Sequence, residues 1–169
     1  MIVADTGPII AFARIGRLSL LHDVVGVLTI PHAVYEELVG RGHGRPGAAE
    51  VAHGTWIHRR TVRDIAAVAH LPSILHTGER EAIILATELH AQLLIDERRG
   101  REMATARGLE VFGSLRILGE AKRSGVIPAV RPIIQELLDA GYWIDEERVI
   151  HVFLEEMGEA PLIPGLPQE

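Results

Sequence analysis

The chain of 169 residues contains no cysteine. Disulfide bonds, thiolate zinc sites and cysteine nucleophiles are therefore excluded, and we expect a reducing, cytoplasmic environment. The nine histidines do not replace the missing thiolates as zinc ligands. His53 and His58 are five residues apart, which matches no common zinc spacing, and the sequence has no His-Glu-x-x-His segment.

Long apolar runs are also missing. No segment approaches the roughly 20 apolar residues that span a bilayer. The first residues lack the basic stretch and the apolar run of a secretory signal. We therefore expect no association with a membrane.

An excess of positive charge is the third absence. The chain has 17 Lys and Arg against 23 Asp and Glu, a formal net charge of −6. Proteins that bind nucleic acid are usually basic, because neutralising phosphates supplies much of the affinity. A cluster of cation-binding acids would lower the net charge without preventing such binding. The arginines form two groups, which are either nucleic-acid contacts or solvated helix faces: Arg98, Arg99, Arg101 and Arg107, and Arg59, Arg60 and Arg63.

Aromatic residues are scarce as well, at 4% of the chain, whereas hydrophobic residues make up 47%. The core must therefore consist mainly of Leu, Ile, Val and Ala side chains, and the length fits one domain better than two.

Short apolar runs, which predict buried strands, alternate with segments of helical periodicity. This alternation predicts an α/β fold with three layers, in which a short central parallel sheet lies between helices. A weaker helical pattern covers residues 61–70. The glycine-rich residues 40–47 follow a helix and lack the Lys-Ser/Thr ending of a phosphate-binding loop, so we interpret them as a plain loop. The expected strands are residues 2–4, 27–30, 56–57, 92–95 and 110–112, and the expected helices are residues 9–14, 18–25, 31–39, 78–90, 97–107 and 115–123.

The pattern changes after residue 125. Residues 130–138 and 145–157 predict a C-terminal helical hairpin, with Tyr142 and Trp143 in the turn between its helices. Three prolines close together at the end predict a flexible tail. We therefore divide the chain into an α/β domain at 1–125, a helical extension packed on it at 126–157 and a tail at 158–169.

Acidic residues occupy the ends and starts of these elements. Asp5 follows the first expected strand, Asp96 follows the fourth, Glu37 lies on the helix after the second, and Glu79 and Glu81 begin the helix at Gly78. The carboxyl ends of parallel strands meet at a crevice where α/β sheets bind ligands. Converging carboxylates repel one another unless a hard divalent cation such as Mg²⁺ or Mn²⁺ neutralises them. The set predicts a metal-dependent site that cleaves phosphodiesters.

Each acid also has a simpler explanation. Asp5 and Asp96 are good N-caps for the helices that follow them. Glu79 is favourable at a helix start through the helix dipole, and Glu37 fits an exposed helix surface. Only the joint order of the four favours a site.

In that order, residues 3–6, 37–38, 78–83 and 94–97 resemble the motifs of PIN-domain nucleases, and most closely those of VapC-like toxins. The resemblance covers roughly residues 1–125, and the helical end is similar to an extension in one PIN-like subgroup. It implies that Asp5, Glu37 and Asp96 bind Mg²⁺ or Mn²⁺ and act in catalysis, with Thr6 supporting Asp5.

The third acid of the family pattern has two candidates, Glu79 and Glu81, both retained as metal ligands. They are two positions apart, so they point in different directions on a helix. The family pattern favours Glu81. The position of Glu79 directly after Gly78, where the chain enters the helix, favours Glu79, which we take as the catalytic residue.

The resemblance implies an endoribonuclease toxin that acts on RNA, is silenced by a small antitoxin protein and forms a homodimer. A haloacid dehalogenase-type phosphotransferase is disfavoured, because it needs an acid two residues after Asp5, where this chain has Gly7. An inactive PIN-like scaffold or regulatory binding module is the other alternative, and the acidic net charge suits it.

Overall fold

A parallel sheet forms the centre of the molecule. The computed structural model describes residues 1–41, 44–142 and 147–162. Five strands pair in the order β3-β2-β1-β4-β5, and all the pairs are parallel. The strands lie close to where the sequence predicts them: β1 (Ile2–Ala4), β2 (Leu28–Pro31), β3 (Ile57–Arg60), β4 (Gln92–Leu94) and β5 (Val111–Phe112).

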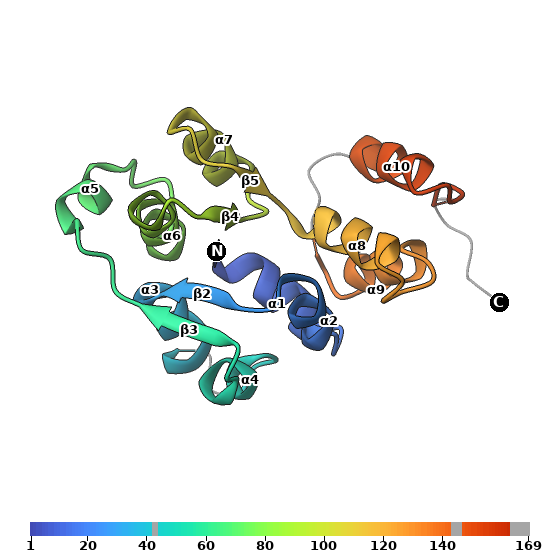
Figure 1. Cartoon of the computed structure of the whole chain (residues 1–169), viewed down its shortest axis with the longest axis horizontal. Helices are drawn as coiled ribbons and strands as arrows, with labels where there is room; N and C mark the ends of the chain where they lie inside the picture. The colour runs from blue at the N-terminus through green and yellow to red at the C-terminus, as the bar shows by residue number, and fades with distance from the viewer. Residues whose placement is uncertain (42–43, 143–146, 163–169) are drawn as a thin grey trace.

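Helices cover both faces of this sheet, which confirms the expected α/β/α architecture (Figure 1). Within the described ranges, no helix combines the length and hydropathy needed to cross a bilayer. The helices are α1 (Thr6–Arg14), α2 (Leu18–Val25), α3 (His32–Tyr35), α4 (Ala48–His53), α5 (Ile65–His70), α6 (Thr77–Leu89), α7 (Arg98–Ala106), α8 (Ser114–Arg123), α9 (Arg131–Asp139) and α10 (Glu147–Glu156), with a π-helical turn η1 (Glu36–Gly40) after α3.

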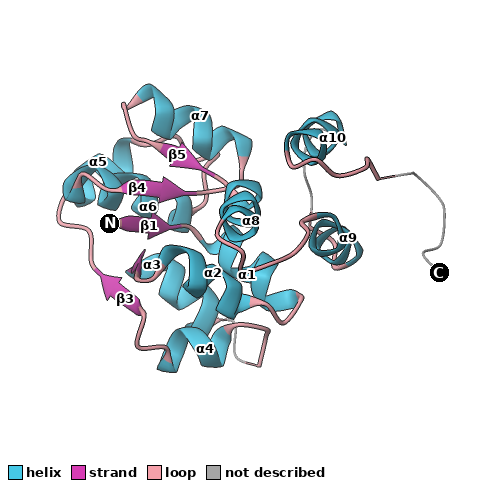
Figure 2. Cartoon of the chain, turned by 45° about the vertical axis from the view of Figure 1, so that its right-hand side comes forward, coloured by secondary structure: helices cyan, strands magenta, loops and turns pink. Residues whose placement is uncertain are grey.

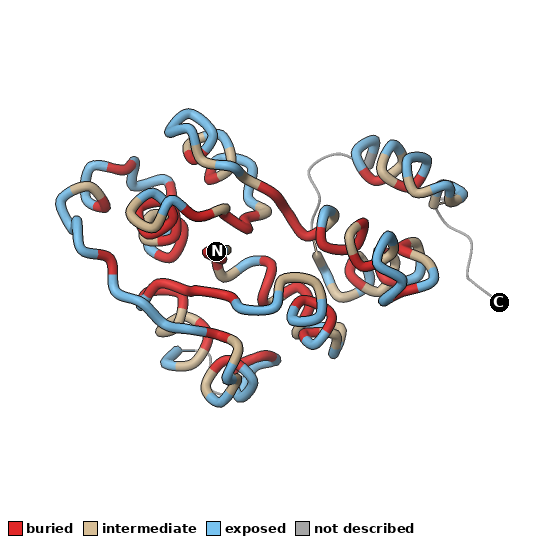
Figure 3. Tube along the Cα trace, viewed as in Figure 1, coloured by how far each residue is buried: buried red, intermediate tan, exposed pale blue. Residues whose placement is uncertain are grey.

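The strands separate two hydrophobic clusters. Successive side chains on a strand point to opposite faces, so Ala4 and Leu94 join a cluster with α1, α2 and α8. Val3 and Leu93 join the other cluster, with α5, α6 and α7. All four side chains are fully buried. Figure 3 shows buried residues concentrated in the centre of the molecule, as expected of strands covered on both faces.

The register of the central strands sets the position of the acids. β1 lies between β2 and β4, with Ala4 opposite Leu94. Directly after β1, the backbone N–H of Asp5 donates to the Leu94 carbonyl at 3.0 Å. Asp5 and Asp96 therefore leave neighbouring strands at the same carboxyl edge of the sheet.

Two elements differ from the sequence expectation. The helix expected at 31–39 is α-helical only to Tyr35 and continues as the π turn η1, in which the Arg41 N–H bonds to the Glu36 carbonyl at 2.8 Å. The apolar periodicity of the sequence did not reveal the π turn, because a regular α-helix would also bury Val34 and Leu38. Helix α4 was not expected: it begins after Gly47, whose φ of +88° suits glycine.

The C-terminal helices pack against the first helices of the chain. Ile134 and Leu137 of α9 and Leu154 of α10 share a hydrophobic cluster with Phe12 of α1. Figure 2 shows α9 and α10 beyond α8, away from the strands. After β5 the described residues contain helices and loops but no strand. Trp143, residues 145–146 of the expected second helix and residues 163–169 of the expected tail lie outside the described residues.

A half-buried carboxylate, that of Glu159, anchors the far end of this segment. Glu159 accepts hydrogen bonds from the Lys122 ammonium and, at 2.8 Å each, from the backbone N–H groups of Val130 and Arg131 at the start of α9. Burial alone would raise the pKa of Glu159, but these donors lower it. The chain after α10 is thus tied to both α8 and α9.

The packing of α9 gives a stability prediction. Ile134 is fully buried, so Ile134→Ala should reduce the free energy of unfolding by about 2–5 kcal/mol. Val126 is 43% exposed, and Val126→Ala should change it by less than about 0.5 kcal/mol. Urea unfolding should show one transition for each variant. A separate early transition in Ile134→Ala would mean that α9 unfolds independently of the sheet.

Candidate functional site

Asp5 is a buried carboxylate at the centre of the carboxyl edge. It is 6% exposed and forms the N-cap of α1, where its carboxylate accepts from the Gly7 N–H at 3.4 Å. That hydrogen bond is long. The capping role expected from the sequence is therefore present, but it compensates little for burying a negative charge.

Other carboxylates surround Asp5. Burial is the main cause that raises the pKa of Asp5 to about 7, and the charges of Glu79 and Glu37 raise it further, against the N–H groups of Thr6 and Gly7. Carboxylates from β1, η1 and α6 thus face a common region. The structure brings three of the predicted site residues together there.

Glu37 is held between α1 and α6. Its carboxylate accepts from the Thr6 hydroxyl at 2.6 Å and from the Gly78 N–H at 3.2 Å. A Cβ on residue 78 would lie 3.0 Å from a Glu37 oxygen, so a glycine fits the close approach. Glu37 therefore does not face solvent on an exposed helix surface. The Thr6 hydroxyl supports Glu37, whereas the Thr6 N–H stabilises the charge of Asp5.

The two acids of α6 have separate partners. Glu79 is 4% exposed, and its carboxylate accepts from the His76 N–H at 2.7 Å in a capping box. Burial raises the pKa of Glu79, which the Glu97 and Glu37 charges also raise and His76 lowers. Glu81 instead accepts from the Ala33 N–H at 2.9 Å and joins α6 to α3. Glu79 is the acid that interacts electrostatically with Asp5.

Asp96 is fixed by a residue that the sequence did not single out for the site. Its two oxygens accept from the backbone N–H and the hydroxyl of Ser114, each at 2.7 Å. Asp96 does not cap α7, whose N-cap is Glu97. Ser114 is the first residue of α8, and its place two residues after the last strand was the available signal.

Tyr142, from the turn after α9, lies near the same carboxylate. Burial and then the Asp96 charge raise the pKa of Tyr142 well above its usual range, so the phenol stays protonated. The sequence placed this residue only in the turn of the C-terminal helical hairpin.

A groove opens beside Asp5 and Asp96. It has a volume of about 1370 Å³ and runs between α7, β5 and α8 on one side and α10 on the other. Apolar side chains of α10, including Val149 and Val152, line it together with charged groups. Its arginines are Arg98, Arg101, Arg116 and Arg148.

The arginine groups of the sequence have different positions. Arg98 and Arg101 of the first group line the groove, and Arg101 donates to the Ile95 carbonyl at 3.3 Å. In the second group, Arg59 lies on β3 with its guanidinium 4.6 Å from the centre of the Tyr35 ring. The first group is therefore the one beside the acids.

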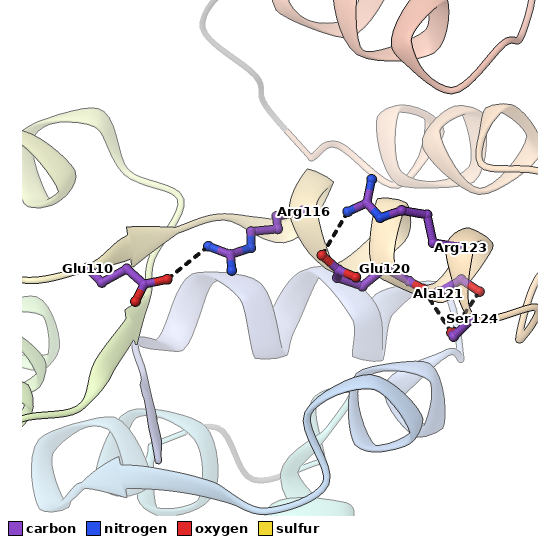
Figure 4. Close-up of polar contacts among 6 residues, drawn as sticks. All are labelled: Glu110, Arg116, Glu120, Ala121, Arg123 and Ser124. Carbon is purple, nitrogen blue, oxygen red and sulfur yellow. Dashed lines mark hydrogen bonds and ion pairs between the residues drawn. The ribbon is translucent and has the colours of Figure 1, made fainter.

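Ion pairs organise the α8 wall of the groove (Figure 4). Arg116 pairs with Glu110 at 3.3 Å and stacks 5.0 Å over the Phe112 ring. Further along the helix, Arg123 pairs with Glu120 at 2.7 Å. These pairs are about half exposed, so their role is to orient side chains more than to stabilise the fold.

The donor chemistry fits a hard divalent cation. Asp5, Glu37, Glu79 and Asp96 offer only carboxylate oxygens, the ligands that Mg²⁺ and Mn²⁺ prefer. The buried Asp5 lies among like charges that a cation would neutralise. Within the described residues, no three acidic or histidine side chains are gathered closely enough to hold a metal as they stand.

Comparison with known proteins identifies the class. A sequence model of the PIN domain matches residues 1–159, and the chain therefore belongs to the PIN-domain family. PIN domains are generally nucleases and typically use divalent metals. The family resemblance expected from the motifs is confirmed.

A solved structure supports the same fold. The chain is similar to a PilT N-terminus domain protein from the hyperthermophilic archaeon Sulfolobus solfataricus P2, with a TM-score of 0.51 and 18% identity. The match covers 71% of this chain and 92% of that one. The comparison with curated proteins finds no match.

The buried charge of Asp5 predicts a pH-dependent cost. The folded pKa of about 7 exceeds the ordinary value of 3.8, so the folded state holds the extra proton and stability falls as pH rises between these values. In a chelator, Asp5→Asn should become more stable relative to wild type from about pH 5 to about pH 8. At 1.36 kcal/mol per pKa unit, the two units between pH 5 and the folded pKa of about 7 should give a gain of about 2–3 kcal/mol.

Chemical denaturation at the two pH values measures this gain. The matched control is Asp23→Asn, because Asp23 is exposed on α2 and should give no pH-dependent gain. A constant stability difference between Asp5→Asn and wild type would show that Asp5 ionises freely in the fold.

Proposed function

We propose that this PIN domain is a metal-dependent endoribonuclease that hydrolyses phosphodiester bonds of RNA. The observation that carries the proposal is the group of Asp5, Glu37 and Glu79, in which burial first and then the charges of Glu79 and Glu37 raise the pKa of Asp5. Asp96 follows the adjacent strand and opens with Asp5 onto an arginine-lined groove. Such an arrangement combines acids for a cation with a surface for a phosphate backbone.

Each group has a chemical role in this proposal. A Mg²⁺ or Mn²⁺ ion held by Asp5, Glu37, Glu79 and Asp96 would supply Lewis acidity and activate a water. Thr6 and Gly78 hold Glu37 in place, and Ser114 orients Asp96.

The arginines of α7 would bind the substrate. Arg101 is braced by the Ile95 carbonyl, which keeps its guanidinium at the mouth of the groove. A fixed guanidinium pairs with phosphate oxygens in a defined orientation. This group therefore offers RNA a binding surface despite the net charge of −6.

We further propose that the protein is the toxin of a toxin–antitoxin pair and a homodimer. The VapC-like motifs support the first part, with a small antitoxin that places a helix or a basic side chain near the acids. The apolar faces of α2 and α3 cannot form the interface of the proposed homodimer, because Leu21 and Val34 are fully buried in the core of their own chain. Ile65 and Ile74, each 59% exposed, offer an apolar surface instead.

An inactive scaffold or regulatory module is the second candidate. This candidate is favoured because, in the part of the chain that the structure describes, the carboxylates are not close enough together to form a coordination sphere. Cleavage activity decides between the two candidates.

Incubation with mixed RNA tests the nuclease. Wild type should cleave when Mg²⁺ or Mn²⁺ is added, and Asp5→Asn should lose more than the roughly 10- to 100-fold typical of a lost outer-sphere partner. Glu79→Gln should lose more activity than Glu81→Gln, because a glutamine at 81 can still accept from Ala33.

Glu102→Gln is the matched control, since Glu102 lines the groove but pairs with Arg98 on the helix surface. Its activity should be close to wild type. Metal-independent cleavage, or equal cleavage by wild type and Asp5→Asn, would indicate a contaminant and favour the scaffold.

Two measurements test the partners. The purified chain at micromolar concentration should sediment as a dimer, and Ile65→Asp with Ile74→Asp should shift it toward a monomer. Expression in cells should arrest growth, and co-expression of the neighbouring small gene product should restore it. A monomer in the sedimentation experiment would contradict the proposed dimer. Equal growth with and without the neighbouring small gene product would contradict the proposed toxin role.

A further inference from the structure

Arg116 is a groove residue that has no part in the chemistry of the acids. It lies on the first turn of α8, and its side chain lines the groove together with Asp5 and Asp96. Figure 4 shows the Arg116 guanidinium turned toward Glu110, which precedes β5. The acids lie beyond the carboxyl ends of the strands, so the guanidinium extends along the groove away from them.

Two contacts hold this guanidinium in place. It donates to the Glu110 carboxylate at 3.3 Å, and its central carbon lies 5.0 Å from the centre of the Phe112 ring. Phe112 is buried, so the core fixes the position of the ring. The Arg116 side chain is still 48% exposed. One side of the guanidinium is thus covered by an aromatic ring, and the exposed remainder is available to a ligand in the groove.

Apolar side chains accompany Arg116 along the groove. Val111 and Leu115 belong to the same wall, and Val149 and Val152 belong to the wall formed by α10. Val149 and Val152 are 44% and 45% exposed, so the core of this chain leaves them uncovered. A flat cationic group between apolar walls suits a planar ligand such as a nucleobase, which has apolar faces.

The charge of the groove favours the same ligand. Its arginines are accompanied by Glu97, Glu102 and Glu156, and the whole chain has a net charge of −6. Attraction between the groove and the phosphates of RNA is therefore partly cancelled. Base stacking does not depend on net charge, and proteins stack unpaired RNA bases on aromatic rings and on arginine guanidinium planes. An RNA in this groove gains affinity from such a contact.

We propose that Arg116, held over Phe112, is a stacking surface for one unpaired base of the RNA substrate, so that this part of the groove is a base-binding subsite. The proposal rests on the RNA substrate of the proposed function and is independent of its metal. Lysine at position 116 would keep the charge but lose the flat surface, so Arg116→Lys separates stacking from pairing with phosphate.

Binding to two oligonucleotides measures this separation. The full chain is titrated into a fluorescent single-stranded oligouridylate and into its abasic counterpart, which has the same sugars and phosphates without bases. A chelator prevents metal-dependent cleavage. Arg116→Lys should bind oligouridylate about 5-fold or more weakly than wild type, the lower limit for one stacked base, and should bind the abasic chain like wild type. Equal losses for both ligands, or no loss for either, would overturn the subsite.

Arg123→Lys is the matched control. Arg123 lies on the same helix, is about half exposed and pairs with Glu120 as Arg116 pairs with Glu110 (Figure 4). It is not one of the described residues that line the groove. Arg123→Lys should therefore bind both ligands like wild type. If it lost as much affinity for oligouridylate as Arg116→Lys, the effect would not belong to the groove, and the subsite would be refuted.

The position of the base is measured in the unaltered chain. Trypsin cuts after Arg107 and Arg116, so residues 108–116 form one peptide that contains Phe112. Ultraviolet cross-linking of an oligonucleotide that contains 4-thiouridine should attach the base to this peptide. Cross-links confined to other peptides would contradict the subsite, and this result does not depend on whether Arg116→Lys folds.

The outcomes separate the subsite from the proposed nuclease. If the binding of oligouridylate depends on Arg116 but no RNA is cleaved when Mg²⁺ or Mn²⁺ is added, the nuclease proposal fails and the subsite stands. If wild type cleaves RNA and Arg116→Lys binds both ligands like wild type, the subsite fails and the nuclease stands. A wild type that binds neither ligand also overturns the subsite.

Discussion

Burial of the Asp5 carboxylate beside two other acids is the constraint on which this structure depends. Three chain segments separated by more than 30 residues each bring an acid near the end of β1, and burial first, then the charges of Glu79 and Glu37, raise the pKa of Asp5 to about 7. A stable fold would avoid this arrangement unless the acids served another purpose, because burying unpaired charge is costly. The acids also have defined hydrogen-bond donors: Thr6 and Gly78 hold Glu37, and His76 holds Glu79. Because groups with perturbed pKa values cluster at functional sites, this arrangement supports a functional role for the acids.

The sheet was predictable because its signal is local. Strands buried on both faces appear as short apolar runs, and β1 and β4 lie within one residue of their predicted bounds. Where local signals conflict, the prediction failed. The π turn at Glu36 has one additional residue in each hydrogen-bonded ring. The apolar pattern does not reveal this residue, because Val34 and Leu38 are buried as they would be in a regular α-helix. Helix α4 follows directly on a glycine-rich stretch, whose composition indicates loop and hides the short apolar pattern of Val51.

The site was predictable in its list of acids but not in their partners. Position after a strand identified Asp5 and Asp96, and helix geometry indicated that Glu79 and Glu81 differ. The packing of α3 against α6 decides which of these two acids points toward Asp5. There, the Ala33 N–H donates a hydrogen bond to the Glu81 carboxylate, which leaves Glu79 as the acid near Asp5. Ser114 and Tyr142 lie 18 and 46 positions from Asp96 and carry no motif, so only the folded chain relates them to it. The proposed cation ligands could be identified from their positions at strand ends and on helices, whereas the residues that contact them depend on tertiary packing.

This distinction changes how the C-terminal helices are understood. Their hydrophobic contacts with α1 could be those of any appended segment. One polar contact is more specific, because it joins this segment to the α/β part: Glu159 accepts a hydrogen bond from Lys122 of α8. At the other end of the segment, Tyr142 lines the groove together with Asp96. Between them, α10 forms the outer wall of the groove with Val149 and Val152. The C-terminal segment therefore limits the width of the groove between α7 and α10, where the proposed substrate would bind.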